Sequence, residues 1–343
     1  MATMRTSDAS VEQVLVNGAG SGEATPGHRR LSGGGRTAEL AIDTAHKAAL
    51  RSIARVVDET AEPQDPAFAE AGIYAMLAAR DVLVITGAGV STDSGIPDYR
   101  GPNGSLKRHR PMTYQEFKHD PAARQRYWAR SFVGWRHMHA AEPNRGHYLL
   151  AEFERHGWIS GIVTQNVDGL HAAAGSENVI PLHGDLSLVR CLNCGTVEAR
   201  PDLDARLLAA NPGYLERIDL DPSAVNPDGD VSLEDRHVRA FTMVGCLTCG
   251  SIELKPDVVY FGENVPAGRK REVADLEAAS RSVLVVGSSL AVMSGYKIVL
   301  DAVRAGKQVG IINGGPSRAD AKADWRWRVR VGAALERLHE DLL

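Results

Sequence analysis

The sequence predicts an α/β fold in which helices wrap a parallel sheet and a smaller second module is inserted. Three observations support this prediction. Short runs of β-branched and other apolar residues recur, and Gly or polar residues follow most of these runs. Between two pairs of cysteines, the composition becomes rich in Pro, Asp and Asn. With 343 residues, 43% of them hydrophobic, the chain can bury one full core and a smaller one beside it.

The composition argues against several classes of function. The formal net charge is -4 and no long block of Lys or Arg occurs, so the basic surface expected of a general nucleic-acid-binding protein is missing. No apolar run approaches the roughly 20 residues that span a bilayer, and the first residues do not form a signal peptide. We therefore expect a cytoplasmic protein, a monomer by preference, without nucleic-acid or membrane partners.

The N-terminal part is expected to carry no chemistry. Residues 1–36 are rich in Gly, Ser and Ala and lack periodic hydrophobic residues, which predicts a disordered tail. Apolar residues then recur at helical spacing over 37–57 and again over 66–80. Each of these two segments is predicted to form an amphipathic helix.

Five apolar runs predict the buried strands of the sheet. Runs of this kind are typical of strands covered on both faces, and hence of a parallel sheet. Because open α/β sheets bind ligands at the carboxyl ends of their strands, the residues that follow the runs should meet in one crevice. The runs are 82–85, 159–163, 179–182, 283–286 and 309–312, and four of them are followed by Gly87, by Gln165 and Asn166, by Gly287, Ser288 and Ser289, and by Asn313.

A glycine-rich turn, Gly87-Ala88-Gly89, follows the first run. Glycines here would let the backbone approach a pyrophosphate; a plain strand-to-helix turn is the alternative. A dinucleotide dehydrogenase would have a third glycine at position 92 and an acidic residue about 20 residues further on. Position 92 is Thr, and no buried strand follows, so the nucleotide should be held differently from a hydride-transfer cofactor. The loop that continues the turn would carry an aromatic lid, Tyr99, and a fixed cation, Arg100.

Polar side chains and a histidine follow the second and third runs. Gln165, Asn166 and Asp168 can hold ribose hydroxyls and a carboxamide, since amides donate and accept whereas a carboxylate accepts. On the local pattern alone, a helix N-cap cluster explains them equally well. His183 ends the third run, where a single histidine is usually a structural residue.

The four cysteines form two Cys-x-x-Cys pairs and predict one structural zinc ion. Paired in this way in a large protein of a reducing compartment, they favour metal over disulfides. Two such turns supply four thiolates at about 2.3 Å from Zn and leave no position for substrate water. The intervening segment is expected to lack a core of its own, and residues 201–240 should loop out, since compact ribbons have only about 15–20 residues there. The ligands are Cys191, Cys194, Cys246 and Cys249.

Residues 254–263 predict an exposed edge strand that ends in a glycine. Such an edge can pair with an extended peptide by adding a strand. A plain edge strand shielded by Pro256 is the alternative.

Taken together, these motifs resemble those of the sirtuin family. The segment from Gly87 to Arg100 resembles the family signature, and Gln-Asn-Val-Asp, His-Gly, the paired cysteines and Gly-Ser-Ser follow in the family's order. The resemblance extends from about Ile73 to the C-terminus. The local sequences at 96–100, 124–130 and 294–296 are most similar to those of the branch that contains the mitochondrial class II enzymes and some bacterial ones.

The resemblance implies the fold and the domain organisation. Residues 37–188 and 255–343 would form an NAD-binding Rossmann-like domain, and 189–254 a zinc-ribbon domain on which part of 101–150 packs. NAD would be a consumed cosubstrate, one zinc per chain would be structural, and proteins with acylated lysines would be the substrates.

The resemblance also assigns the site residues. His183 would be the general base, Asn166 would act beside it, and the segment after the second cysteine pair would form a wall of the acyl-lysine channel. The expected NAD contacts are Gly87, Ala88, Gly89, Ser91, Thr92, Asp98, Tyr99, Arg100, Gln165, Asn166, Asp168, Gly287, Ser288, Ser289, Asn313 and the backbone near Val331, and the expected substrate contacts are Val259, Tyr260, Phe261 and Gly262.

By the family's chemistry, the acyl oxygen attacks the ribose carbon that bears nicotinamide, and nicotinamide leaves. His183, neutral near working pH because its ordinary pKa is about 6.5, would then deprotonate a ribose hydroxyl that attacks the acyl carbon. The products would be free lysine and an acylated ADP-ribose. Two alternatives stay open: a mono-ADP-ribosyltransferase that uses the same pocket, and a non-catalytic NAD or ADP-ribose sensor.

The preferred acyl group is open as well. In another branch of the sirtuins, a Tyr and an Arg three residues later select acidic acyl groups, and Tyr127 and Arg130 have that spacing. The residues that flank Tyr127 and Arg130 in the sequence resemble those of class II sirtuins instead.

Overall fold

A computed structural model describes residues 33–100, 104–107, 110–219 and 225–343. Residues 1–40 and 41–343 form two separate units, and both sheets, the cavity and the cysteine cluster belong to the second. Most of the predicted tail, 1–36, lies outside the described residues, and its last four residues begin helix α1, Gly33–Ile53. Helix α2, Pro66–Ala78, starts where the sequence predicts and ends two residues earlier.

Six strands form a parallel sheet in the order β3-β2-β1-β7-β8-β9. Numbered along the sheet, this is the 3-2-1-4-5-6 order of Rossmann folds, so the predicted fold class is confirmed. All five predicted strands are present, whereas β9 was missed because two of its three residues are Trp and none is β-branched. The strands are β1 Val82–Thr86, β2 Ile159–Thr164, β3 Val179–Pro181, β7 Ser282–Val286, β8 Val309–Ile312 and β9 Trp325–Trp327.

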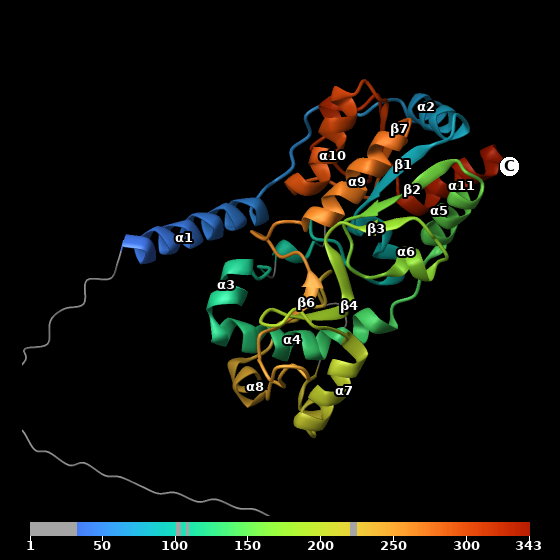
Figure 1. The fold of residues 1–343 in the computed structure, drawn as a ribbon. Coiled ribbons are helices and arrows are strands. Elements are labelled where there is room, and N and C mark those ends of the chain that lie inside the picture. The colour runs from blue at the N-terminus through green and yellow to red at the C-terminus, as the bar shows by residue number, and fades with distance from the viewer. Residues whose placement is uncertain (1–32, 101–103, 108–109, 220–224) are drawn as a thin grey trace, which may run out of the picture. The chain divides into compact units, whose positions relative to one another are not determined.

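Helices cover both faces of this sheet (Figure 1). Successive strand residues point to opposite faces, so Val82 and Val84 pack against α2, α5 and α11, whereas Leu83 and Ile85 pack against α9 and α10. All five residues of β1 are buried, as the apolar run predicts. The bounds of these helices are α5 Arg145–Arg155, α9 Ala267–Ala279, α10 Met293–Arg304 and α11 Val331–Leu342.

A second, three-stranded antiparallel sheet has the order β5-β4-β6. Its central strand β4, Gly184–Cys191, starts directly after His183 and ends at the first cysteine. One continuous strand therefore connects the candidate base to the cysteine cluster. The other two strands are β5 Val197–Ala199 and β6 Leu254–Val258.

The segment between the cysteine pairs folds differently from its prediction. It contains helices α7, Arg200–Ala210, and α8, Asp235–Ala240, rather than a loop over 201–240. Its apolar side chains, among them Leu203 and Phe241, are buried in a second core with α4, Pro121–Ala140. The segment thus has no core of its own, as expected, because α4 supplies much of the apolar surface against which it packs.

The predicted exposed strand over 254–263 is also corrected. Strand β6 is at the edge of the small sheet, but it ends at Val258 and four of its five residues are buried. Residues 259–263 continue as an irregular segment.

The remaining helices have clear local causes. Thr113 and Glu116 form a capping box at the start of α3, Tyr114–His119, and Asp120 caps α4 with Pro121 at its first position. The short helix α6, Leu170–Ala173, follows β2. Of the helices in the described part of the chain, none has the length and apolar character to cross a membrane.

Candidate functional site

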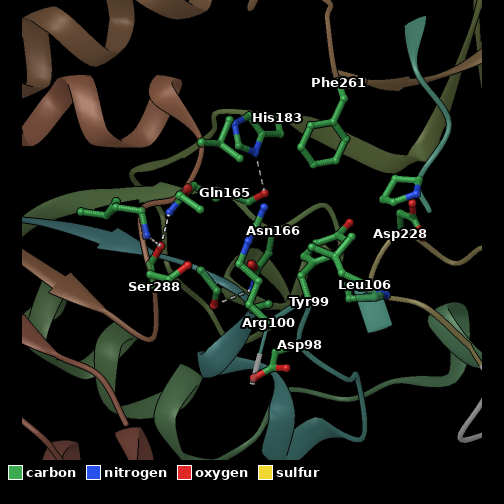
Figure 2. Close-up of a pocket in the computed structure, with 18 of the residues that line it drawn as sticks. Asp98, Tyr99, Arg100, Leu106, Gln165, Asn166, His183, Asp228, Phe261 and Ser288 are labelled. Atoms are coloured by element: carbon green, nitrogen blue, oxygen red, sulfur yellow. Dashed lines mark hydrogen bonds between the residues drawn. The ribbon is translucent and has the colours of Figure 1, made fainter. Parts of the chain in front are cut away.

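A cavity of about 1590 Å³ opens at the carboxyl ends of the parallel strands. It exceeds the roughly 300–1000 Å³ of common small-molecule pockets and so has room for a dinucleotide and part of a second substrate. Every residue predicted to contact NAD or the substrate lines it, and so does His183. Figure 2 shows Tyr99, Asn166, His183 and Phe261 around this space. The crevice that the strand-end residues predicted is therefore present.

The glycine turn lies at the switch point of the sheet, between β1 and β7. The Gly89 N–H donates to Gly287 O over 2.9 Å, so the turns after the two strands touch. A Cβ atom on Gly87 would lie 2.7 Å from Ser288 Cβ, and one on Gly89 would lie 2.8 Å from Gly287 O. The turn continues as two short 3₁₀ turns rather than a long helix. Its glycines are thus required by the close approach of two backbones, which also leaves backbone accessible to a ligand.

Ser91 connects two of the polar residues that follow β2, Asn166 and Asp168. Asn166 Nδ2 donates to Ser91 Oγ over 3.0 Å and to Gly87 O over 3.2 Å. Ser91 Oγ in turn donates to Asp168 Oδ2 over 2.7 Å. Burial raises the pKa of Asp168 above its ordinary value, while hydrogen bonds from the Leu170 amide and Ser91 oppose this shift. The network fixes the amide and the carboxyl group before any ligand arrives.

Gln165 fastens the ends of three strands to one another. Its Nε2 donates to Ser288 Oγ over 2.8 Å and to Thr86 O over 3.2 Å. Its backbone oxygen lies 3.0 Å from Nδ1 of His183. Gln165 and Ser288, both predicted NAD contacts, are therefore bonded to each other in this structure.

His183 lies at the cavity with both ring nitrogens occupied. Nδ1 faces the carbonyl oxygen of Gln165, and Nε2 lies 2.7 Å from Ser294 Oγ on α10. Burial lowers its pKa to about 4, and Arg269 acts in the same direction while the Gln165 carbonyl opposes it. The ring is consequently neutral at physiological pH, as a general base must be.

His171 is buried, and its Nε2 lies 2.9 Å from Thr86 Oγ1, which gives it a structural role. It packs edge to face against His147.

The predicted lid residues differ in their contacts. Tyr99 is half-buried, and its pKa is raised well above the ordinary value by burial and by Asp228, so its hydroxyl stays neutral. The guanidinium of Arg100 donates to the carbonyls of Ser52, Ile53 and Arg55, at and just beyond the end of α1, over 3.3 to 3.4 Å. Arg100 is thus fixed by the N-terminal helix.

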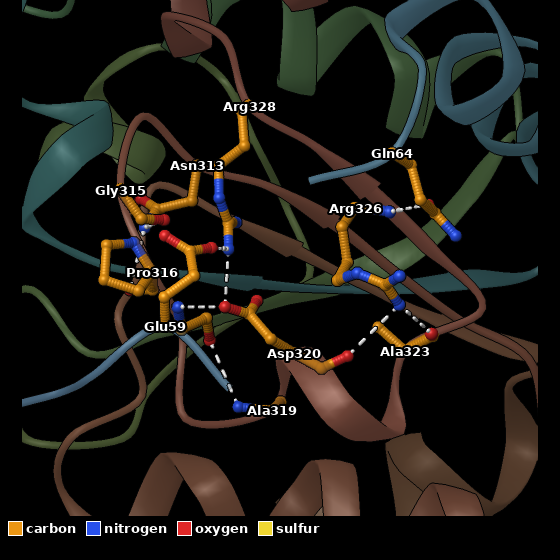
Figure 3. A network of polar contacts seen from close by, with 11 residues as sticks. Glu59, Gln64, Asn313, Gly315, Pro316, Ala319, Asp320, Ala323, Arg326 and Arg328 are labelled. Carbon is orange, nitrogen blue, oxygen red and sulfur yellow. Dashed lines mark hydrogen bonds and ion pairs between the residues drawn. The ribbon is translucent and has the colours of Figure 1, made fainter. Parts of the chain in front are cut away.

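The loop after β8 carries Asn313, whose Nδ2 donates to Gly315 O over 2.8 Å. A buried charge network holds the surroundings of this loop (Figure 3). Asp320 is fully buried and pairs with Arg328, which also contacts Glu59 over 2.6 Å. Through Glu59, the segment after α1 is thereby linked to Arg328, which follows β9, and through Arg328 to Asp320.

The predicted substrate wall is held by a buried lysine. Lys255 is 5% exposed, donates to Val258 O, and lies 3.0 Å from a carboxylate oxygen of Glu263. Glu263 accepts from the Tyr260 N–H over 2.9 Å. At the start of the wall, the Val259 N–H donates to His183 O over 2.7 Å.

The far end of the wall is bonded to α3. The Tyr114 N–H donates to Phe261 O over 2.9 Å, and Gln115 Nε2 donates to Gly262 O over 3.1 Å. Gly262 has a φ of +85°, a conformation that favours glycine.

Tyr127 and Arg130 do not act as a pair in the cavity. Tyr127 lines it, but Arg130 does not; its guanidinium lies 3.8 Å from a carboxylate oxygen of Asp230. Asp228 and Asp230 both line the cavity near Tyr127. Arg130 therefore offers no free cation to a ligand in this part of the cavity.

The four cysteines form a cluster in which the sulfur atoms all lie within 4.8 Å of one another. Cys191 Sγ is 3.6 Å from Cys249 Sγ, and Cys194 Sγ is 3.7 Å from Cys246 Sγ. These distances are too long for disulfides, and they match the separation of about 3.8 Å between sulfurs on a tetrahedral zinc ion with Zn–S bonds of about 2.3 Å. The four thiols are thus positioned to bind a structural metal ion.

The structure adds cavity residues that the sequence did not mark. The sequence gave none of them a role at the site, and only the folded chain brings them there. They include Leu50, Ser52, Ile53, Arg55, Val56, Asp228, Asp230, Met293, Ser294 and Lys297.

Comparison with known proteins gives a consistent result. The model of the Sir2 family matches residues 87–294. NAD-dependent protein deacetylase 1 of Corynebacterium efficiens is 64% identical over 271 residues, which cover 79% of this chain and 96% of that protein. NAD-dependent protein deacylase Sirt4 of Drosophila melanogaster is 41% identical over 268 residues, covering 77% and 84%.

Solved structures of Sir2 enzymes are similar in fold. One, described as a Sir2–p53 peptide–NAD+ complex, has a TM-score of 0.60 and 29% identity and covers 79% of this chain and 97% of its own. Another, Sir2Tm bound to a propionylated peptide, has a TM-score of 0.60 and 28% identity with the same coverage.

Proposed function

The chain belongs to the Sir2 family, and from this premise we propose that it is an NAD-dependent protein lysine deacylase. It would convert NAD and an acylated lysine into nicotinamide, free lysine and O-acyl-ADP-ribose. The observation that carries the proposal is the position of His183. A neutral histidine with one nitrogen fixed lies between the nucleotide turn and the peptide wall, in one cavity.

Each part of the cavity has a proposed task. The backbones of the Gly87–Gly89 turn would hold the pyrophosphate, and Asn166 and Asp168, fixed by Ser91, would orient the ribose and the carboxamide. NAD supplies the ribose carbon that is attacked and nicotinamide as the leaving group. Because the wall at Val259 is bonded to His183 O, a peptide bound along it would place its lysine near the base.

The remaining contacts belong to the same proposal. Tyr99 and Arg100 would cover the reaction face, and Val331 and Asn313 would lie beside the adenosine part. One zinc ion held by Cys191, Cys194, Cys246 and Cys249 would be structural, since four thiolates leave no open position for chemistry.

The organisation expected from the sequence is also proposed. Residues 37–188 and 255–343 would form the NAD-binding part and 189–254 the zinc-binding part. We place the protein in the cytoplasm, acting as a monomer on acylated proteins.

Uncharged acyl groups are the proposed substrates. Arg130, the cation that would pair with an acidic acyl group, does not line the cavity and is engaged by Asp230. A succinyl carboxylate would therefore lose solvation in the cavity without gaining that cation as a partner, so acidic acyl groups should react more slowly.

The test is to incubate the purified protein with NAD and matched acetyl-, butyryl- and succinyl-lysine peptides, following nicotinamide and peptide mass together. Peptide-dependent nicotinamide release with loss of the acyl mass supports deacylation. A mass gain of one ADP-ribose would identify the transferase alternative, and absence of nicotinamide release would identify the sensor. Faster turnover of succinyl than of acetyl peptide would overturn the proposed acyl preference alone.

A further inference from the structure

Ser294, in the first turn of α10, lies against the nitrogen of His183 that faces away from Gln165. Its Oγ is 2.7 Å from Nε2, a short distance for a hydrogen bond to nitrogen. The sequence marked this serine only as part of a segment similar to class II sirtuins and gave it no role, because its chemistry depends on a histidine 111 residues earlier in the chain.

The two partners of His183 determine its tautomer. Nδ1 lies 3.0 Å from the backbone oxygen of Gln165, and a carbonyl oxygen can only accept. Nδ1 must therefore carry the proton. Since the ring is neutral, Nε2 keeps its lone pair and accepts the hydroxyl proton of Ser294.

The packing of α10 holds this serine in place. A Cβ atom on the neighbouring Gly295 would lie only 2.6 Å from Oε1 of Gln165, so the first turn of the helix packs directly on Gln165. Gln165 is also the residue whose backbone accepts from Nδ1. The ring is thus held between a carbonyl and a hydroxyl whose supports touch each other.

We propose that Ser294 is a positioning residue for His183, which holds the ring in the tautomer and orientation that make Nε2 the proton acceptor. This role rests on the deacylase function proposed above. In the base step, the O–H bond of a ribose hydroxyl breaks and an Nε2–H bond forms, giving an imidazolium and an alkoxide that attacks the acyl carbon. Because Nε2 has a single lone pair, the Ser294 hydroxyl first turns away and the ribose hydroxyl takes its place. After the proton transfer, Ser294 Oγ can accept from the new Nε2–H, since a hydroxyl both donates and accepts.

The step at which Ser294 acts makes the proposal testable. Cleavage of nicotinamide precedes the base step, so exchange of labelled nicotinamide into NAD should not need Ser294. In Ser294→Ala, deacylation should fall about threefold to tenfold, the effect of one orienting hydrogen bond, while nicotinamide exchange stays within about twofold of wild type. Ser294→Thr keeps the hydroxyl and should restore deacylation. Arg304→Gln, at the exposed end of the same helix, controls for general effects on α10.

A spectroscopic readout tests the contact without activity. With ¹⁵N-labelled histidine, the His183 signals, assigned by their loss in His183→Ala, should show protonated Nδ1 and a hydrogen-bonded Nε2 in the wild type. The Nε2 signal should move toward that of a free lone pair in Ser294→Ala and return in Ser294→Thr.

Two results would overturn the proposal. An Nε2 signal that is the same in the wild type and in Ser294→Ala would show that there is no hydrogen bond. Equal loss of exchange and deacylation without rescue by Thr would show that the residue is merely structural. A wild-type protein that does not cleave NAD would instead remove the deacylase proposal, and the catalytic role of Ser294 with it, while the nitrogen signals would still decide the hydrogen bond.

Discussion

His183 illustrates what one residue gains from its surroundings. Its local sequence, a histidine at the end of an apolar run, is more typical of a structural residue, and only the resemblance to sirtuins indicated a base. The structure adds the physical reason: burial keeps the ring neutral, and the Gln165 carbonyl leaves Nε2 as the proton acceptor.

Replacing His183 tests this role. His183→Ala should lower deacylation at least about 100-fold, the usual scale for loss of a general base, while the Kd for NAD changes less than about threefold. Steady-state kinetics and calorimetric NAD titration measure the two quantities. His119→Ala, at the exposed end of α3, is the matched control. Equal loss of NAD binding and activity would mean that the histidine supports the fold rather than the chemistry.

Other site residues could not be predicted at this scale. The sequence gave Ser294, Asp228 and Asp230 no role, because their relevance depends on contacts with residues far away in the chain. Arg100 was correctly placed at the cavity, but its bonds to the end of α1 could not be foreseen from a helix pattern that shows only an apolar face.

At the scale of elements, prediction followed the strength of the local pattern. The five strands with dense β-branched runs were found because burial on both faces demands such runs. Strand β4 was missed because its buried and exposed residues do not alternate regularly, and α7 because its core partner is α4 rather than an element nearby in sequence.

The wall after β6 depends on one buried ion pair. Lys255→Met removes the buried cation that joins Val258 O and Glu263, and leaves the half-buried Glu263 carboxylate without its cation. We expect the KM for the acyl peptide to rise about tenfold, with a smaller change in the KM for NAD. Initial-rate kinetics with each substrate varied in turn would show this. A larger effect on NAD than on peptide would place the lysine's influence elsewhere, and Lys118→Met, on an exposed lysine, is the control.

The cysteine cluster lies at one end of the small sheet, where Cys191 is the last residue of β4. We predict one zinc per chain by elemental analysis. Chelation, or Cys194→Ser, should unfold the β5-β4-β6 sheet, because the bound metal supplies folding free energy. Hydrogen exchange followed by mass spectrometry would detect faster exchange in 184–258 before the parallel sheet opens. A metal-free preparation with full protection and full activity would contradict this prediction.

Across the whole molecule, buried neutral histidines couple stability to pH. Burial lowers the pKa of His147 to about 4 and that of His171 to about 3, below the ordinary 6.5. Below pH 6.5 the unfolded chain therefore binds protons that the folded chain does not. The free energy of unfolding should fall as the pH drops from about 6.5 toward 4.

His171→Gln isolates this effect, since glutamine can bond to Thr86 Oγ1 without titrating. Urea unfolding between pH 7 and pH 4.5 should give a slope of stability against pH that is smaller by about 1.4 kcal/mol per pH unit near pH 5. Loss of metal at low pH affects both proteins and cancels in the comparison. Identical slopes would mean that His171 is not kept neutral by the fold.

The account as a whole states that an acyl group moves from lysine to the ribose of NAD in the cavity beside His183. The most direct test uses a peptide whose lysine carries a ¹³C-labelled acetyl group, with mass spectrometry of every product. We predict that the label appears on ADP-ribose in a one-to-one ratio with released nicotinamide. Label that stays on a peptide which has gained ADP-ribose, or label released as acetate while NAD is intact, would contradict the account.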